Sequence, residues 1–85
     1  MKWTRELIVN ELKSILISAD ERKRAVVEGC TEQANLSLDL GLSSVGILYI
    51  VIAVEETFNI RFDNASTADF TTLGEVVDYI EARVQ

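Results

Sequence analysis

The stretch DLGLSSVGILYIVIAVEETFNI, residues 39–60, decides the fold, because a turn with two adjacent serines leads into a long apolar run. The run of apolar or small residues, Val45 to Val54, is ten residues long, about half of what a helix needs to cross a bilayer. It therefore predicts a core helix, from Ser44 to about Thr57, and no membrane span. The residues expected in the core are Leu48, Val51, Ile52, Val54 and Phe58.

Upstream of this helix, the apolar spacing predicts another helix from about Thr4 to Ser18, with Trp3 packed at its entrance. Its expected buried stripe consists of Ile8, Leu12, Ile15 and Leu16. From Ala19 to Leu42 the apolar pattern lapses, which predicts a long loop of the kind that is usually functional or poorly ordered. The basic residues in this loop are interpreted as a solvated surface; they are Arg22, Lys23 and Arg24.

Downstream, Asp63 and Asn64 can cap a single short helical turn. Thr72 with Glu75 fits the Ser/Thr-x-x-Glu capping box, so a last helix is predicted to begin there. Its expected apolar face consists of Leu73, Val76, Val77, Ile80 and Val84. We therefore predict one all-α domain, residues 1–85, with three main helices, one short helix and a long first loop.

Composition and charge narrow the classes of function. The 85 residues contain no proline, are 48% hydrophobic and carry a net charge of −6, with +2 in residues 1–24 and −8 in residues 25–85. Nucleic-acid phosphates and anionic lipid repel such a chain, so its expected partners are proteins and not nucleic acid or membrane. The start MKWTRELIVN interleaves charged and apolar residues, unlike a secretory signal, and we expect a cytoplasmic protein.

No catalytic residue and no metal site are expected. The sequence has no histidine to activate a serine nucleophile, and the single cysteine, Cys30, excludes a disulfide within the chain and a cysteine-based metal cluster. Glu55 and Glu56 are adjacent, so on a helix they point about a hundred degrees apart and do not form an acid/base pair. So small a helical domain also leaves no deep cleft, and an enzyme is not expected.

The paired serines differ in their expected roles. An N-cap side chain accepts hydrogen bonds from N–H groups of the first turn, and Ser43 is expected to act in this way. Ser44 then occupies the first helical position, with its hydroxyl directed outward near the positive end of the helix dipole, where a phosphate is favoured. Paired serines at a helix start are also common as simple caps, and by themselves they favour that reading.

The whole chain closely resembles the acyl and peptidyl carrier proteins, in which a Leu-Gly turn precedes an Asp-Ser-Leu motif and a helix closing with Glu-Glu-x-Phe. Here LGLSSV, residues 40–45, and EETF, residues 55–58, agree in spacing, and TLGEVVDYIEARV, residues 72–84, is similar to the last carrier helix. The resemblance implies a four-helix carrier-protein bundle in which Ser44 receives 4′-phosphopantetheine from coenzyme A and the cargo is carried as a thioester. Ser43 replaces the usual aspartate, and Val45 the usual leucine.

The resemblance also implies partners for a stand-alone, monomeric carrier: a phosphopantetheinyl transferase, a loading ligase or adenylating enzyme, and condensing or tailoring enzymes. The residues expected to dock them are Leu42, Val45, Gly46 and Tyr49. This surface is neutral where fatty-acid carriers generally present acidic residues, so it looks more like carriers of nonribosomal peptide or polyketide biosynthesis. The alternative functions are a carrier of fatty-acid synthesis and an unmodified helical interaction module. The alternative to a docking surface is that Tyr49 and Ile50 help to fill the core.

Overall fold

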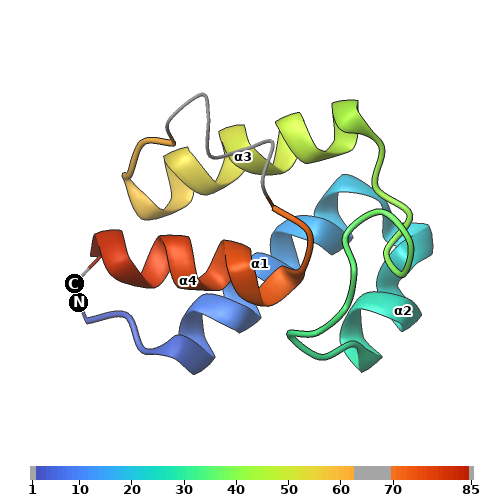
Figure 1. The fold of residues 1–85 in the computed structure, drawn as a ribbon, viewed down its shortest axis with the longest axis horizontal. Helices are drawn as coiled ribbons and strands as arrows, with labels where there is room; N and C mark the ends of the chain where they lie inside the picture. The colour runs from blue at the N-terminus through green and yellow to red at the C-terminus, as the bar shows by residue number, and fades with distance from the viewer. Residues whose placement is uncertain (1, 63–69, 85) are drawn as a thin grey trace.

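The computed structural model describes residues 2–62 and 70–84, and within them the regular elements are helices. They are α1 (Arg5–Ala19), the 3₁₀ helix η1 (Glu21–Lys23), α2 (Arg24–Gly29), α3 (Ser44–Phe58) and α4 (Leu73–Val84) (Figure 1). The predicted all-α class is confirmed, and so are the three main helices. The short turn predicted at Asp63 and Asn64 lies outside the described residues, and the short helix that the structure describes is α2.

The connection between α1 and α3 is more ordered than the long loop that we predicted. It begins with η1 and α2, and Val27 of α2 is fully buried. Further along, Asn35 Oδ1 accepts hydrogen bonds from the N–H groups of Ser37 (3.0 Å) and Leu38 (2.8 Å). The sequence did not indicate α2 because a six-residue helix with one buried position has no periodic apolar pattern.

The second half of this connection lies beside the start of α4. The N–H of Leu36 donates to the carbonyl of Thr71 (2.8 Å), and the N–H of Gly74 donates to the carbonyl of Glu32 (2.8 Å). A Cβ atom at position 74 would lie only 3.0 Å from that carbonyl oxygen, so glycine permits the close approach. These contacts fix the position of the connection relative to the helices.

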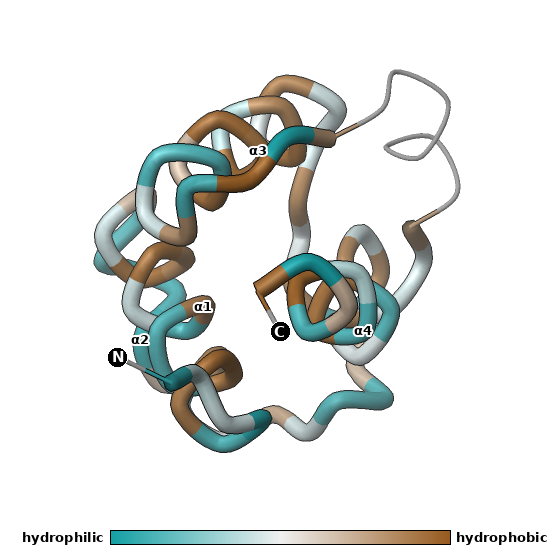
Figure 2. The backbone as a smooth tube through the Cα atoms, turned by 90° about the vertical axis from the view of Figure 1, so that its left-hand side faces the viewer, coloured by the Kyte–Doolittle hydropathy of each residue, from teal (hydrophilic) through white to brown (hydrophobic). Residues whose placement is uncertain are grey.

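One apolar core lies between α1, α3 and α4, which surround a common interior when viewed along the helices (Figure 2). α1 packs against both other helices and runs opposite to them (Figure 1). The predicted buried stripe of α1 is confirmed, and so is that of α4, in which Val84 is half-buried. Trp3 packs on Phe58, with ring centroids 4.5 Å apart, which confirms its predicted packing at the entrance of α1. The largest fully buried side chains are Ile8, Leu12, Leu16, Leu40, Leu73, Ile80, Val27, Val54 and Val77.

The buried face of α3 differs in part from the predicted one. The prediction was wrong for Leu48, which is 59% exposed, and for Ile52, which is 49% exposed. A helix made almost entirely of apolar residues offers no polar contrast from which its buried face could be found. The buried residues of α3 are Ile50, Val51, Val54 and Phe58.

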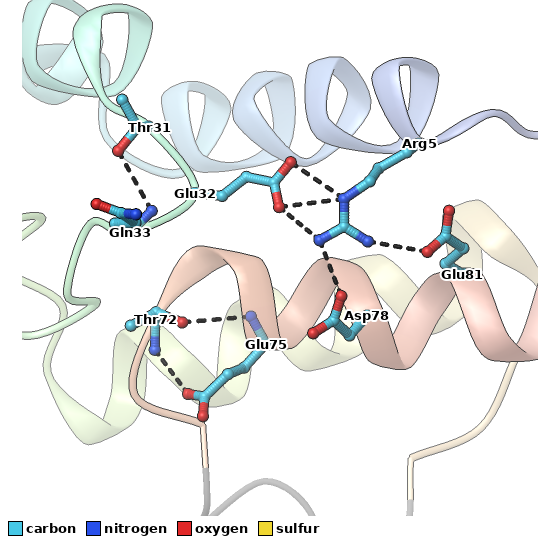
Figure 3. A network of polar contacts seen from close by, with 8 residues as sticks. All are labelled: Arg5, Thr31, Glu32, Gln33, Thr72, Glu75, Asp78 and Glu81. Atoms are coloured by element: carbon cyan, nitrogen blue, oxygen red, sulfur yellow. Dashed lines mark hydrogen bonds and ion pairs between the residues drawn. The ribbon is translucent and has the colours of Figure 1, made fainter.

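Arg5 joins three parts of the chain through ion pairs (Figure 3). Its Nη1 lies 2.8 Å from Glu81 Oε1, its Nη2 2.8 Å from Asp78 Oδ1, and its Nε donates to Glu32 Oε1 at 3.1 Å. Hydrogen bonds, foremost that with Glu32, raise the pKa of Arg5 above its ordinary value. Three carboxylates therefore pair with Arg5 at the start of α1. This cluster is far from the start of α3, because the two helices begin toward opposite ends of the molecule (Figure 1).

The predicted capping box at the start of α4 is confirmed (Figure 3). Thr72 Oγ1 accepts a hydrogen bond from the N–H of Glu75 (3.3 Å). In return, Glu75 Oε1 accepts from the N–H groups of Thr72 (2.9 Å) and Thr71 (2.6 Å). These backbone donors, Thr72 first, stabilise the carboxylate and lower the pKa of Glu75 below its ordinary value.

We expect this box to make the stability of the fold depend on pH. Because the folded-state pKa of Glu75 is depressed, its stabilisation is present above the unfolded-state pKa and is lost as the pH falls through the folded-state pKa. Urea unfolding from neutral pH down to about pH 3 should therefore show a smaller loss of unfolding free energy in Glu75→Gln than in wild type. The control, Glu56→Gln, should keep the wild-type pH dependence. An unchanged pH dependence in Glu75→Gln would contradict this expectation.

Candidate functional site

The chain enters α3 through a tight turn that is anchored on the core. Gly41 has a φ angle of +67°, in the left-handed region that favours glycine. Its N–H donates to the carbonyl of Ser37 (3.1 Å), and the N–H of Leu42 donates to the carbonyl of Leu36 (3.0 Å). Leu40 is buried in the core, and Leu42 packs against it. The two serines that follow are thus held in a fixed place.

Ser43 is the N-cap of α3, as predicted. Its backbone is extended, with φ −86° and ψ 174°, and its Oγ accepts a hydrogen bond from the N–H of Gly46 at 3.2 Å. The carbonyl of Ser43 accepts from the N–H of Ile47 at 2.9 Å. The hydroxyl oxygen of Ser43 is therefore bound to the first turn of the helix.

Ser44 is the first residue of α3 and is exposed. Within residues 2–62 and 70–84, its hydroxyl makes no hydrogen bond with another side chain. The first turn of α3 contains no acidic residue, so no like charge opposes a phosphate ester there, and the helix dipole favours one. An accessible hydroxyl in this position fits a covalently attached phosphate group.

The four predicted docking residues differ in accessibility. Val45 is 77% exposed and Tyr49 is 49% exposed. Leu42 and Gly46 are half-buried, and Leu42 packs against the core. The alternative of a core role is wrong for Tyr49 and is confirmed for Ile50, which is buried.

The exposed face of α3 includes two residues that we predicted to lie in the core. Leu48 and Ile52 extend the exposed surface at spacings of three and four residues, so that one side of the helix is apolar. We define the α3 stripe as Val45, Leu48, Tyr49 and Ile52. The first charged residue of α3 is Glu55. The surface that continues from Ser44 along α3 is therefore apolar and uncharged.

An apolar cavity lies behind the turn that leads into α3, between α3 and the other helices. Its volume is about 20 Å³, roughly the space that one water molecule occupies. Its lining comes from α1, α3 and α4, together with Leu36 and Leu42 of the first connection and with Phe62 and Phe70. Because its lining is entirely apolar, the cavity opposes the entry of a charged group.

Neither a metal-binding cluster nor a membrane-spanning helix occurs in the parts of the chain that the structure describes. Within these parts, no three His, Cys, Asp or Glu side chains are grouped so that they could hold a metal ion. Cys30 is a half-buried free thiol. No described helix is sufficiently long and apolar to cross a bilayer.

Comparison with known proteins agrees with this geometry. Residues 10–80 match the family described as "Phosphopantetheine attachment site". The acyl carrier protein of Thermotoga maritima is 32% identical over 84 residues, which cover 95% of this chain and 96% of that protein. The acyl carrier protein of Wolinella succinogenes is 31% identical over 74 residues, covering 87% and 93%. Acyl carrier protein 3 of Ralstonia nicotianae is 32% identical over 75 residues, covering 88% and 83%.

Proposed function

Because the chain belongs to the family of phosphopantetheine-binding carrier proteins, and its cofactor is therefore covalently attached 4′-phosphopantetheine, we propose that Ser44 is the attachment residue. One observation carries this assignment. The hydroxyl of Ser44 is exposed at the start of α3, whereas the Oγ of Ser43 is bound to the N–H of Gly46 at 3.2 Å. When bound, the group supplies a thiol on which cargo is held as a thioester.

We expect attachment to require a partner enzyme, because α3 has no charged side chain near Ser44 that could act as a base. The first charged residue of α3, Glu55, lies about 16 Å further along the helix axis. In the proposed step, the Ser44 Oγ–H bond breaks and an Oγ–P bond forms, and adenosine bisphosphate leaves coenzyme A. A phosphopantetheinyl transferase takes the proton. The role of this chain is to present the hydroxyl on a rigid helix start.

The protein in this proposal carries acyl, aminoacyl or peptidyl intermediates and has no catalytic activity of its own. Cargo is loaded by a ligase or adenylating enzyme and is used by condensing or tailoring enzymes. We assign the carrier to nonribosomal peptide or polyketide biosynthesis because of the α3 stripe. A partner that recognises this stripe must offer an apolar surface, since the stripe contains no charge with which a basic patch could pair.

Fatty-acid synthesis is the second candidate pathway. It is favoured by the names of the relatives, which are acyl carrier proteins. An unmodified interaction module is no longer a candidate, because members of the family carry the prosthetic group. The identity of the cargo separates the two pathways.

Fragmentation mass spectrometry of the protein isolated from its native cell tests this proposal. We expect one phosphopantetheine on Ser44, in part bearing cargo on its thiol. An aminoacyl, peptidyl or branched polyketide cargo would support the assigned pathway, and a series of saturated straight chains would support fatty-acid synthesis. A phosphopantetheine found on Ser43 would contradict the attachment site.

Docking provides a separate prediction. We expect Tyr49→Ala to weaken binding to the loading or condensing enzyme by about 1–2 kcal/mol, roughly tenfold, because buried aromatic residues contribute most at such interfaces. Val45→Ala should weaken binding less, and the matched control Val26→Ala, on α2, should leave it unchanged. Titration calorimetry or surface plasmon resonance measures the dissociation constants.

Salt distinguishes apolar docking from electrostatic docking. Raising the salt from about 0.1 M to about 1 M should slow association, because residues 25–85 carry a net −8, but it should leave most of the affinity. Binding that collapses with salt, while Tyr49→Ala binds as wild type does, would show that the α3 stripe is not the main contact.

A further inference from the structure

The end of η1 lies against the turn that leads to the attachment residue, and both are on the same side of the molecule (Figure 1). The side chain of Lys23 crosses between them, with its Nζ 3.5 Å from the carbonyl oxygen of Gly41. A Cβ atom at Gly41 would lie 3.0 Å from the same Nζ. An ammonium group is thus seated on the turn three residues before Ser44.

Lys23 differs from the basic residues on either side of it. Arg22 pairs with Asp20 at 3.0 Å. Arg24 pairs with Glu21 of η1 at 2.7 Å and with Glu28 of α2 at 3.4 Å. Among the ion pairs of residues 2–62 and 70–84, none includes Lys23. Lys23 is half-buried against the turn, so the prediction of a solvated surface is wrong for this residue.

The nearby carboxylates are engaged with other groups. Asp20 has its pKa lowered chiefly by hydrogen bonds from Arg22, and Lys23 makes the smallest contribution. Asp39 Oδ2 accepts a hydrogen bond from the N–H of Asn35 at 2.7 Å. The contact of the lysine with Gly41 is at the outer limit of a hydrogen bond, and a phosphate oxygen would be a stronger acceptor than this carbonyl.

We propose that Lys23 is a positioning residue that binds the phosphodiester formed on Ser44 and so sets the direction in which the prosthetic arm leaves the protein. This inference rests on the proposed attachment at Ser44. The lysine reaches toward the site from η1, so the first part of the arm is drawn to the η1 side of the turn and away from the α3 stripe. The stripe then stays open to a partner while the arm is attached.

Nuclear magnetic resonance of the wild-type protein tests the contact without any substitution. The chain has three lysines, Lys2, Lys13 and Lys23, so their side-chain ¹⁵Nζ signals can be followed individually before and after attachment. We expect the Lys23 signal to shift on conversion to the holo protein. The signals of Lys2, before α1, and of Lys13, whose Nζ donates to the carbonyl of Cys30 at 2.9 Å, should not shift. An unshifted Lys23 signal would overturn the proposal.

The ³¹P signal of the phosphodiester gives the reciprocal measurement. In holo Lys23→Gln, this signal should be displaced from its wild-type position, and in Lys23→Arg, which keeps the positive charge, it should lie close to wild type. The matched control Lys2→Gln should leave the signal unchanged. High salt should move the wild-type signal toward that of Lys23→Gln, because screening weakens a partly exposed pair. Identical ³¹P signals in wild type and Lys23→Gln would overturn the proposal.

The measurements distinguish a failure of the Lys23 contact from a failure of the proposed attachment at Ser44. Phosphopantetheine found on a residue other than Ser44 would overturn the proposed attachment and the inference together. A protein modified on Ser44 in which neither the Lys23 nor the phosphorus signal responds would overturn the role of Lys23 alone. Backbone amide spectra of the variants show whether the turn at Gly41 has kept its structure.

Discussion

Ser44→Ala is expected to take up no phosphopantetheine when it is incubated with coenzyme A, magnesium and a broad-specificity phosphopantetheinyl transferase. Wild type should take up one under the same conditions, as measured by intact mass. The expected effect is complete because the other hydroxyl at the start of α3 is engaged as the N-cap of the helix. The neighbouring hydroxyl, that of Ser43, is bound to the N–H of Gly46 at 3.2 Å.

Ser43→Ala is the matched control, since it removes an identical hydroxyl one residue away. We expect this variant to take up one phosphopantetheine. It should also lose about 0.5–2 kcal/mol of unfolding free energy, because the N–H of Gly46 loses its capping acceptor. Ser44→Ala should be less destabilised, since its hydroxyl caps nothing. If Ser44→Ala were still modified, or if Ser43→Ala were not, the roles of the two serines would have to be exchanged.

The parts of the fold that were predicted correctly are those with local chemical contrast. α1 and α4 alternate charged and apolar residues, so that the spacing of Leu12 or Val77 shows which side is buried. The capping box of Thr72 and Glu75 lies within one turn and needs no distant partner. The N-cap role of Ser43 was predictable for the same reason.

The parts that were not predicted depend on contacts between residues distant in sequence. Lys23 and Gly41 are 18 residues apart, and their contact requires η1, which no local sequence pattern predicts. α2 forms because Val27 has a place in the core. That place exists only once α1 and the connection are packed, and so tertiary context decides the local structure.

Leu12 and Leu48 allow the buried and exposed faces to be compared with one residue type. Leu12 of α1 is 1% exposed, and Leu48 of α3 is 59% exposed. Leu12→Ala should lower the unfolding free energy by about 2–5 kcal/mol, because the substitution leaves a cavity that the surrounding core fills only in part. Native domains have total stabilities of about 5–15 kcal/mol, so this variant should lose a large fraction of its stability and unfold at a markedly lower urea concentration than wild type.

Leu48→Ala should change the unfolding free energy by no more than about 0.5 kcal/mol, as surface substitutions generally do. Urea denaturation of both variants measures the difference. A loss for Leu48→Ala as large as that for Leu12→Ala would mean that α3 is rotated about its axis from the position described, and that the α3 stripe is part of the core. With α3 as described, Leu48→Ala should remain folded but bind its partner enzymes less tightly, because an exposed apolar side chain beside the attachment residue contributes to binding and not to folding.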